Sequence, residues 1–206
     1  VIKVFKHFDN RQKRRIYKHL MVSPEFMRKK FFKLINTEIE NVKLGKNAII
    51  IAKMNNLADK KIIEKLYEAS KAGVKIKLIN RSTCSLITGI KSLSENIESI
   101  SIVDRFLEHA RVFIFHNGGE EKFYLSSGDW MNRNLDNRVE VAFPIFDRII
   151  QQQIKNIIEL QWSDNVKARI INPSADGQNN QYKVTESKTK IHSQIATYEL
   201  LKSIHE

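Results

Sequence analysis

Hydrophobic positions recur at helical spacing near the start of the chain and then give way to short apolar runs. Between Ser23 and Gly45 apolar residues return every three or four positions, with Ser23 as a candidate N-cap and Pro24 at the first helical position. Gly45 is suited to end that helix. The continuous run AIIIA at 48–52 is typical of a strand covered on both faces. The pattern therefore predicts a helix followed by a buried strand.

The following segment adds a second helix and a second strand. We expect the helix to begin at Asp59 and to end at Gly73, and the strand to be VKIKLI at 74–79. A right-handed crossover then makes strands 48–52 and 74–79 parallel neighbours. Functional groups in such units collect where the strands end. The side chains at these ends are Lys53, Asn55, Asn80 and Arg81. They predict a donor-rich pocket, although on this pattern alone they could equally cap strand ends in water.

Alternating patterns in the second half of the chain predict antiparallel strands. RVFIF at 111–115 and KFYLSS at 122–127 flank His-Asn-Gly-Gly-Glu-Glu, in which Asn-Gly-Gly can supply the positive φ angles of a hairpin. Further strands are expected at 98–104, 139–145 and 167–172, and further helices from Asp147 to about Trp162 and at 193–204. The fold class is therefore α/β, with a mixed β-sheet flanked by helices.

The domain organisation follows from length and composition. A chain of 206 residues is long enough for one substantial core, and we expect a single domain over 1–206. Residues 1–22 are interpreted as a basic segment. The turn-rich, polar stretch 173–186 is interpreted as a mobile loop.

The hairpin brings together a set of side chains that suits phosphoryl groups. His109 and Arg111 stand at one end of strand 111–115, and the paired strand ends in Ser126, Ser127, Gly128 and Asp129. An imidazole can act as nucleophile, base or acid near neutral pH, and a guanidinium matches phosphate oxygens in pairs. Asp129 could orient the imidazole. An isolated histidine would more often be structural, but the combination favours a site.

Charge points to the same chemistry. The chain carries 35 Lys and Arg against 23 Asp and Glu, a net charge of +12, and such a surface attracts polyanions. Arg133 and Arg138 alternate with asparagines in a loop that resembles an anion cradle. Stacking on nucleic-acid bases would need exposed aromatics, and only Trp130 qualifies, which we expect to pack under the loop. A phosphate site is therefore favoured over a nucleic-acid module.

Compartment and membrane attachment are constrained by simple counts. A lone Cys84 excludes an internal disulfide and a multi-cysteine metal site, which fits a reducing compartment. The sequence contains no transmembrane-length apolar run, and its start is not typical of a signal peptide. We therefore expect a cytoplasmic protein.

Five long segments of the chain resemble the bacterial polyphosphate kinase family, the type that makes polyphosphate from ATP through a phosphohistidine. They include KMNNLADKKIIEKLYEASKAGVKIKLINR, SLSENIESISIVDRFLEHARVFIFHNGG and YLSSGDWMNRNLDNRVEVAFPI, and together the five segments cover nearly the whole chain. The resemblance implies an architecture shared with phospholipase D, in which two related α/β domains each donate a histidine motif to one site. His109-Ala110-Arg111 stands where that superfamily has His-x-Lys, with SSGD in place of its Gly-Ser-x-Asn element.

The resemblance also implies roles for individual residues. Arg81 and His109 match the ATP-phosphate-binding positions, and His109 would be the acid or base partner of a phosphorylated histidine in a preceding domain. That domain would also carry the nucleotide-contacting tyrosine, so this chain alone is expected to be inactive. The resemblance further implies that the basic segment 1–22 leads in from that preceding domain. Residues that could line the path of polyphosphate are Lys53, Asn55, Arg105, Arg111, Ser127, Asp129, Arg133 and Arg138. Some of these could form ion pairs instead, Arg138 with Glu140 or Arg105 with Asp104.

The implied partners are ATP or ADP, polyphosphate and the remaining domains of the same enzyme, with no nucleic acid. Magnesium is expected to accompany ATP with its ligands outside this chain, and the full-length protein is expected to be a homo-oligomer. The sequence departs from the family at Ser82 and Thr83, usually glycine and an apolar residue, and at Gly128, usually alanine. These departures put the loop geometry in question.

Two other functions stay open on the sequence. A phospholipase D-like phosphodiesterase or nuclease would phosphorylate His109 itself and would use a homodimer to supply the second histidine. A basic nucleic-acid-binding module would keep its binding without His109 and Arg81.

Overall fold

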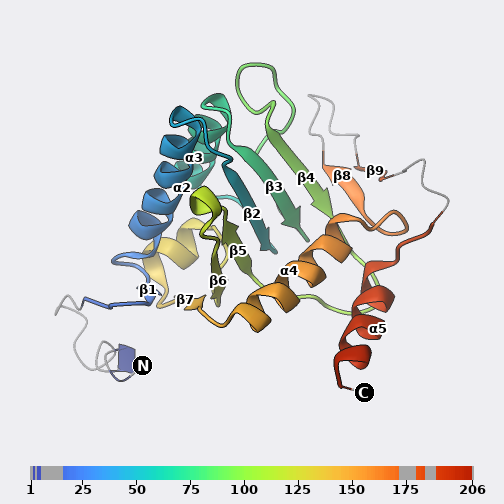
Figure 1. Cartoon of the computed structure of the whole chain (residues 1–206). Helices are drawn as coiled ribbons and strands as arrows, with labels where there is room; N and C mark the ends of the chain where they lie inside the picture. The colour runs from blue at the N-terminus through green and yellow to red at the C-terminus, as the bar shows by residue number, and fades with distance from the viewer. Residues whose placement is uncertain (1, 3, 6–15, 172–179, 184–188, 206) are drawn as a thin grey trace.

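The computed structural model describes residues 2, 4–5, 16–171, 180–183 and 189–205, which form a mixed sheet between helices (Figure 1). The strands are β1 (Met21–Val22), β2 (Ile49–Met54), β3 (Lys75–Asn80), β4 (Ile97–Ser101), β5 (Val112–Phe115), β6 (Lys122–Ser126), β7 (Val141–Ile145), β8 (Arg169–Ile171) and β9 (Asn180–Tyr182). The main helices are α2 (Met27–Lys43), α3 (Lys60–Lys71), α4 (Arg148–Trp162) and α5 (Ser193–His205). Among the described helices, none has the length and apolar character needed to cross a bilayer.

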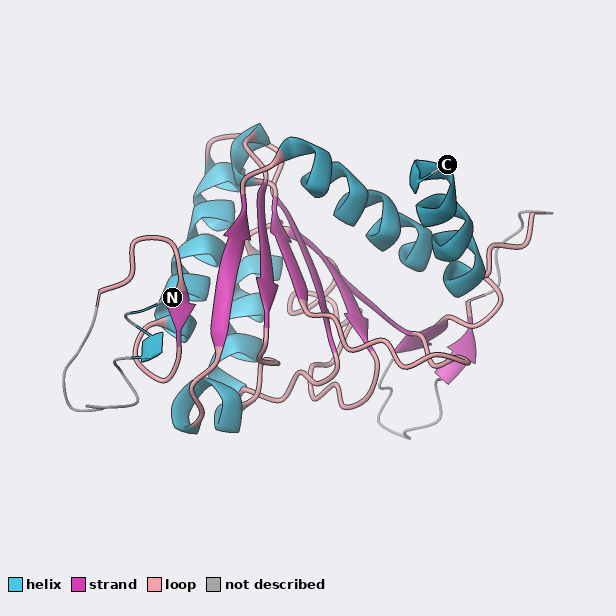
Figure 2. Cartoon of the chain, turned by 90° about the horizontal axis from the view of Figure 1, so that it is seen from below, coloured by secondary structure: helices cyan, strands magenta, loops and turns pink. Residues whose placement is uncertain are grey.

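The helices cover the two faces of the sheet. Helices α2 and α3 lie on one face and α4 and α5 on the other, as two views at right angles show (Figures 1 and 2). One part of the core, under α2 and α3, contains Phe31, Phe113 and Trp130, with the rings of Phe113 and Trp130 stacked at a centroid distance of 4.7 Å. The other part lies under α4 and includes Ile114 and Ile158. Trp130 is fully buried, as predicted, and so offers no surface for base stacking.

The strand order brings several chain segments to one edge. The order is β1-β7-β6-β5-β2-β3-β4-β8-β9, in which β2, β3 and β4 are parallel and β5 runs antiparallel to β2. Strands β5, β6 and β7 pair antiparallel in turn. The carboxyl ends of β2, β3, β4 and β6 and the amino ends of β5 and β7 therefore meet at one edge, which we call the functional edge.

Most elements agree with the sequence predictions. Asp59 caps α3 through a hydrogen bond from the Ile62 N–H, and Asp147 caps α4. Gly45 ends the first helix with φ 68°, and the predicted hairpin turns through Asn117, Gly118 and Gly119, which all have positive φ. These local signals hold because each supplies a backbone group or a φ angle that few other residues can supply.

One prediction about an element was wrong, and one stretch predicted to be a loop contains a short strand. Ser23 is not an N-cap, because α2 begins at Met27; the Ser23 hydroxyl instead donates to the Arg138 carbonyl (2.7 Å) and accepts from the Glu140 N–H (2.9 Å). Strand β9 pairs with β8 within the stretch predicted to be a mobile loop. Residues 173–179 and 184–186 of that predicted loop, and much of the predicted basic segment 1–22, lie outside the described residues.

Candidate active site

Arg81 stands at the functional edge, directly after β3. Its Nε donates to Asn55 Oδ1 at 2.8 Å, so the side chains that follow two neighbouring parallel strands are joined as predicted. Backbone hydrogen bonds extend the pairing into the two loops, from Arg81 N to Met54 O (3.2 Å) and from Ser82 N to Asn55 O (2.8 Å). The loop that carries Arg81 is therefore held by the backbone of the neighbouring loop.

Asp129 connects Asn55 to the hairpin. Its carboxylate accepts from the Asn55 N–H (3.0 Å), from Asn56 Nδ2 (3.0 Å) and from Arg111 Nε (2.9 Å). The residue is 3% exposed. Burial opposes ionisation, but the hydrogen bonds from Arg111, Asn56 and Asn55 outweigh it, and the pKa of Asp129 lies below its usual value. Asp129 is therefore an ionised carboxylate at neutral pH.

Arg111, rather than Asp129, contacts His109. The Arg111 Nη1 lies 3.0 Å from His109 Nδ1 and its Nη2 lies 3.0 Å from His109 Nε2, and Nη1 also donates to the His109 carbonyl at 3.0 Å. A neutral imidazole has one acceptor nitrogen, so one of the two ring contacts can be a hydrogen bond. Asp129, which was expected to orient the imidazole, makes no described contact with it, because Arg111 lies between them. His109 itself is exposed.

These contacts form one continuous set, which we call the edge network. Its members are Arg81, Asn55, Asn56, Asp129, Arg111 and His109. The sequence did not single out Asn56, although its position directly after Asn55 at the strand end was an available signal. The network joins the two residues predicted to bind phosphate, Arg81 and His109, through side chains from three separate chain segments.

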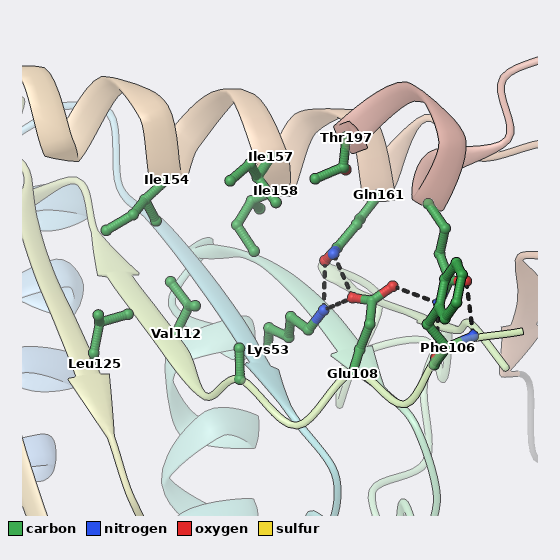
Figure 3. A pocket seen from close by; sticks show the side chains of 12 residues that line it. Lys53, Phe106, Glu108, Val112, Leu125, Ile154, Ile157, Ile158, Gln161 and Thr197 are labelled. Atoms are coloured by element: carbon green, nitrogen blue, oxygen red, sulfur yellow. Dashed lines mark hydrogen bonds and ion pairs between the residues drawn. The ribbon is translucent and has the colours of Figure 1, made fainter. Parts of the chain in front are cut away.

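Lys53 has a different environment from the one predicted. The residue is 7% exposed on the α4 side of the sheet, where its ammonium group forms an ion pair with Glu108 and donates to Gln161 Oε1 at 2.8 Å (Figure 3). Burial lowers the pKa of Lys53, and Glu108 opposes that effect. Lys53 therefore has a structural partner beside the segment that leads to His109.

The same cluster holds the segment before His109. Gln194 at the start of α5 accepts from the Phe106 N–H (3.0 Å), and its Nε2 donates to the Phe106 carbonyl (2.8 Å) and to Glu108 Oε1 (3.1 Å). Sequence patterns gave no sign of Gln161 or Gln194, because their partners are distant in the chain.

An apolar cavity of about 400 Å³ adjoins this cluster, between α4 and the sheet. Ile154, Ile157 and Ile158 line one wall, and Val112 and Leu125 line the other (Figure 3). Apolar walls and a lysine already paired with a carboxylate do not suit a polyanion. The edge network is therefore a better candidate for a phosphate site than this cavity.

The other predicted residues lie at or near the functional edge. Ser127 donates to Glu140 and accepts from the Val141 N–H at 3.0 Å. Arg105, Arg133 and Arg138 are exposed. The two ion pairs suggested by the sequence were wrong: in the described part of the chain Glu140 accepts from Ser127 and Asn134, and Asp104 pairs with His192 and Lys167.

The residues that depart from the family pattern lie in two loops of the functional edge. Ser82 and Thr83 are exposed, and the hydrogen bonds of their loop include backbone groups, such as Leu57 N to Thr83 O at 2.8 Å. A side chain at Gly128 would meet Glu140, whose Cγ would lie 2.9 Å from the added Cβ. The glycine thus permits the close approach of Glu140, which in turn holds Ser127.

Comparison with known proteins gives a consistent family assignment. Residues 20–194 match the family model described as polyphosphate kinase C-terminal domain 2. The polyphosphate kinase of Vibrio vulnificus (strain YJ016) is 49% identical over 188 residues, which are 91% of this chain and 26% of the relative. That of Escherichia coli (strain K12) is 42% identical over 206 residues, all of this chain and 30% of the relative. The chain thus spans less than a third of these relatives.

Solved structures agree with this assignment. Polyphosphate kinase from Porphyromonas gingivalis superimposes with a TM-score of 0.91 at 40% identity, over 98% of this chain and 31% of that one. A phospholipase D family member, Nuc from Salmonella typhimurium, superimposes with a TM-score of 0.55 at 17% identity, over 74% of this chain and 96% of that one. The second likeness concerns the fold alone, and it confirms the predicted phospholipase D-like architecture. The chain belongs to the polyphosphate kinase family, as its C-terminal domain 2.

Proposed function

We propose that this chain supplies one half of the active site of a polyphosphate kinase, which moves the terminal phosphate of ATP reversibly to polyphosphate. The edge network carries this proposal, because it links a guanidinium, Arg81, to an exposed imidazole, His109. Phosphoryl transfer depends on positioning and on charge stabilisation around the moving group. The other half, with the phosphorylated histidine, is assigned to a preceding domain.

The proposed reaction has two steps. The bond between the γ-phosphorus of ATP and its bridging oxygen breaks as a P–N bond to the histidine of the preceding domain forms, and ADP leaves. A terminal oxygen of polyphosphate then attacks the same phosphorus and the P–N bond breaks. Arg81 donates charge-assisted hydrogen bonds to phosphate oxygens. His109 gives a proton to the leaving oxygen and takes it back in the reverse direction.

Arg111 and Asp129 are assigned supporting roles. Arg111 makes its contacts with Asp129 and His109, so we assign it to positioning the imidazole rather than to binding polymer. Asp129 keeps Arg111 and Asn55 in place. Arg105, Arg133 and Arg138 remain proposed as exposed cations along the path of the polymer.

Magnesium is proposed to arrive bound to ATP. In the part of the chain that the structure describes, no three His, Cys, Asp or Glu side chains gather as a metal site would require. These residues do not fit a dedicated site, and we assign the ion no ligand here. For the whole protein we propose a cytoplasmic homo-oligomer, as the family resemblance implies.

Restoring the preceding domains of a polyphosphate kinase ahead of this chain makes the proposal testable. We expect His109→Ala and Arg81→Ala each to slow ATP-dependent polyphosphate synthesis by at least about 100-fold. His116→Gln is the matched control, because His116 follows β5 at the opposite end from His109, and its rate should stay within about twofold. Full activity of the first two variants would refute the assignment. Hydrolysis of a model phosphodiester by this chain alone would favour a phosphodiesterase instead.

A further inference from the structure

A second cavity lies on the side of Arg81 away from His109, at the ends of β3, β4 and β8. Its volume is about 520 Å³, which lies within the usual range of small-molecule sites. The polar side chains that line it include Arg81, Ser82, Ser101, Lys167, Arg169 and Tyr182. Arg81 is the only one of these that also belongs to the edge network. The cavity therefore opens next to the proposed phosphate-binding residue.

The charge of this cavity is positive. Three cations line it, and none of its described lining residues is acidic. Arg81 uses Nε for Asn55, and in the described contacts its two terminal amino groups are left for a ligand. Lys167 Nζ lies 4.0 Å from Asp104 Oδ1, too far for a hydrogen bond. Asp104 still offsets part of the charge of Lys167, whereas Arg81 and Arg169 have no described carboxylate partner. An anionic ligand would relieve the repulsion that remains among the three cations.

Arg169 is held in place by an aromatic ring. Its Nη2 donates to the Tyr182 hydroxyl at 3.0 Å, and its guanidinium carbon lies 4.4 Å from the centroid of the Tyr182 ring. One face of that ring is therefore covered by the guanidinium and is closed to a nucleoside base. Burial raises the pKa of the Cys84 thiol, which also lines the cavity, so the thiol adds no negative charge at neutral pH.

The backbone fixes the three cations relative to one another. Arg169 pairs with Ser101 across β8 and β4, and the Ser101 hydroxyl donates to the Arg81 carbonyl at 3.3 Å. Lys167 N donates to the buried carboxylate of Asp164 at 2.7 Å. The cations thus stand on fixed backbone before any ligand arrives, which lowers the entropy lost on binding.

We propose that this cavity binds linear condensed phosphate, a chain of phosphate groups joined through P–O–P bonds, which extends from Arg81 to Lys167 and Arg169. The identity of the ligand rests on the proposed function, whereas the preference for a polyanion rests on the cavity. Polyphosphate and the triphosphate of ATP share this chemistry. Competition between tripolyphosphate and ATP distinguishes these two sources.

Calorimetric titration of this chain with inorganic tripolyphosphate and with ATP tests the proposal. The test variant is Lys167→Ala/Arg169→Ala, and the more conservative Lys167→Gln/Arg169→Gln, together with circular dichroism, guards against misfolding. The matched control is Lys46→Ala/Lys75→Ala, which also removes two positive charges, but from exposed positions at the opposite end of β2 and β3. We expect saturable binding of tripolyphosphate. Both test variants should weaken it by at least about tenfold, and the control by less than about twofold.

The competing ligands separate the possible outcomes. If tripolyphosphate binds at least as tightly as ATP, the cavity is assigned to polyphosphate. If ATP binds more tightly, and the test variants lose ATP affinity to the same extent, the cavity is assigned to the nucleotide. Absence of saturable tripolyphosphate binding, an equal loss in the control, or equal competition by a single-stranded oligonucleotide overturns the proposal. Failure of the proposed function would give a different result. In the enzyme with its preceding domains restored, the variants Arg81→Ala and His109→Ala would then keep their phosphoryl-transfer activity.

Discussion

At the scale of the single residue, Asp129 holds the edge network together. Its carboxylate joins the loop after β2 to the hairpin, and it is buried with its pKa below the usual value. A pKa that is lower in the folded than in the unfolded state, where it is about 3.9, adds stability above roughly pH 4. That stability is lost as the pH falls through the folded-state pKa.

Asp129→Asn should therefore lower the free energy of unfolding at pH 7 by about 2 kcal/mol, because Arg111 loses its carboxylate partner. Urea denaturation between about pH 3 and pH 7 measures this. The difference between wild type and variant should shrink toward the acid end, because the Asp129 carboxylate binds its proton at a higher pH in the unfolded chain than in the folded one. A constant difference across this range would show that the ion pair is not its cause.

Gly128 is a second residue whose role can be measured. Gly128→Ala should lower the stability by roughly 1 kcal/mol, because the new methyl group must displace the Glu140 side chain. Thermal denaturation of this variant, with and without Glu140→Ala, separates the two causes. In the Glu140→Ala background the penalty should become smaller, because Cγ is removed while the Cβ of residue 140, 3.0 Å from the added carbon, remains. An unchanged penalty there would show that the Glu140 side chain beyond Cβ is not its cause.

At the residue scale, the sequence predicted which side chains gather but not all of their contacts. Arg81, His109 and Asp129 could be predicted together, because each stands at the end of a strand whose partners are set by the crossover and by the hairpin. The position of Arg111 between Asp129 and His109 could not be predicted, since it depends on side-chain conformations within one loop. The partners of Lys53 come from Glu108 and from α4, and no local pattern indicates them.

Lys53 allows the structural interpretation to be tested against the original prediction of a polyphosphate contact. Lys53→Met should lower the stability by about 1 to 2 kcal/mol, because Glu108 and Gln161 lose a buried partner. Tripolyphosphate affinity should stay within about twofold in calorimetry. Weaker tripolyphosphate binding with an unchanged free energy of unfolding would instead support the original prediction that Lys53 contacts polyphosphate.

Among the elements, β8 and α5 are joined by one carboxylate. Asp164 is fully buried and accepts from the backbone N–H groups of Val166 (2.9 Å), Lys167 (2.7 Å), Ala168 (3.0 Å) and Ser193 (2.8 Å). The hydrogen bonds outweigh the effect of burial and keep the pKa of Asp164 below its usual value. One side chain thus fixes both the strand that carries Arg169 and the start of the last helix.

Asp164→Ala should lower the free energy of unfolding by roughly 3 kcal/mol, because it leaves several buried donors without a partner. Amide hydrogen exchange should speed up most at Lys167, Ala168 and Ser193. Asp147→Ala serves as the control, since that residue caps α4 alone. This variant should lower the free energy of unfolding by about 1 kcal/mol and speed up amide exchange at the start of α4 only. Uniform acceleration in both variants would contradict a local role for Asp164.

The order and type of most elements could be predicted, and the errors have physical reasons. Ser23 resembles an N-cap, but its hydroxyl bonds the segment before β7 instead. Its partner Arg138 is 115 residues away in the sequence, so no local pattern could indicate the contact. Strand β9 is short and polar, and it pairs because β8 offers an open edge.

For the whole molecule, a net charge of +12 favours the binding of polyanions in general. Polyanion binding alone therefore does not support the proposal; the residues at which the polyanion binds do. Surface attraction is screened by salt, whereas contacts inside a fixed cavity are screened less. The residues proposed to make specific contacts lie on one edge of the sheet, with the edge network on one side of Arg81 and the basic cavity on the other.

The central claim is that Arg81 and His109 act as one unit through the edge network. The most direct test is a double-mutant cycle on the rate of ATP-dependent polyphosphate synthesis, with the preceding domains restored. Each single alanine variant should lose at least about 100-fold, and the double variant should lose no more than about tenfold beyond the worse single one. A double variant whose loss equals the product of the single losses, or a single variant with wild-type activity, would contradict the account.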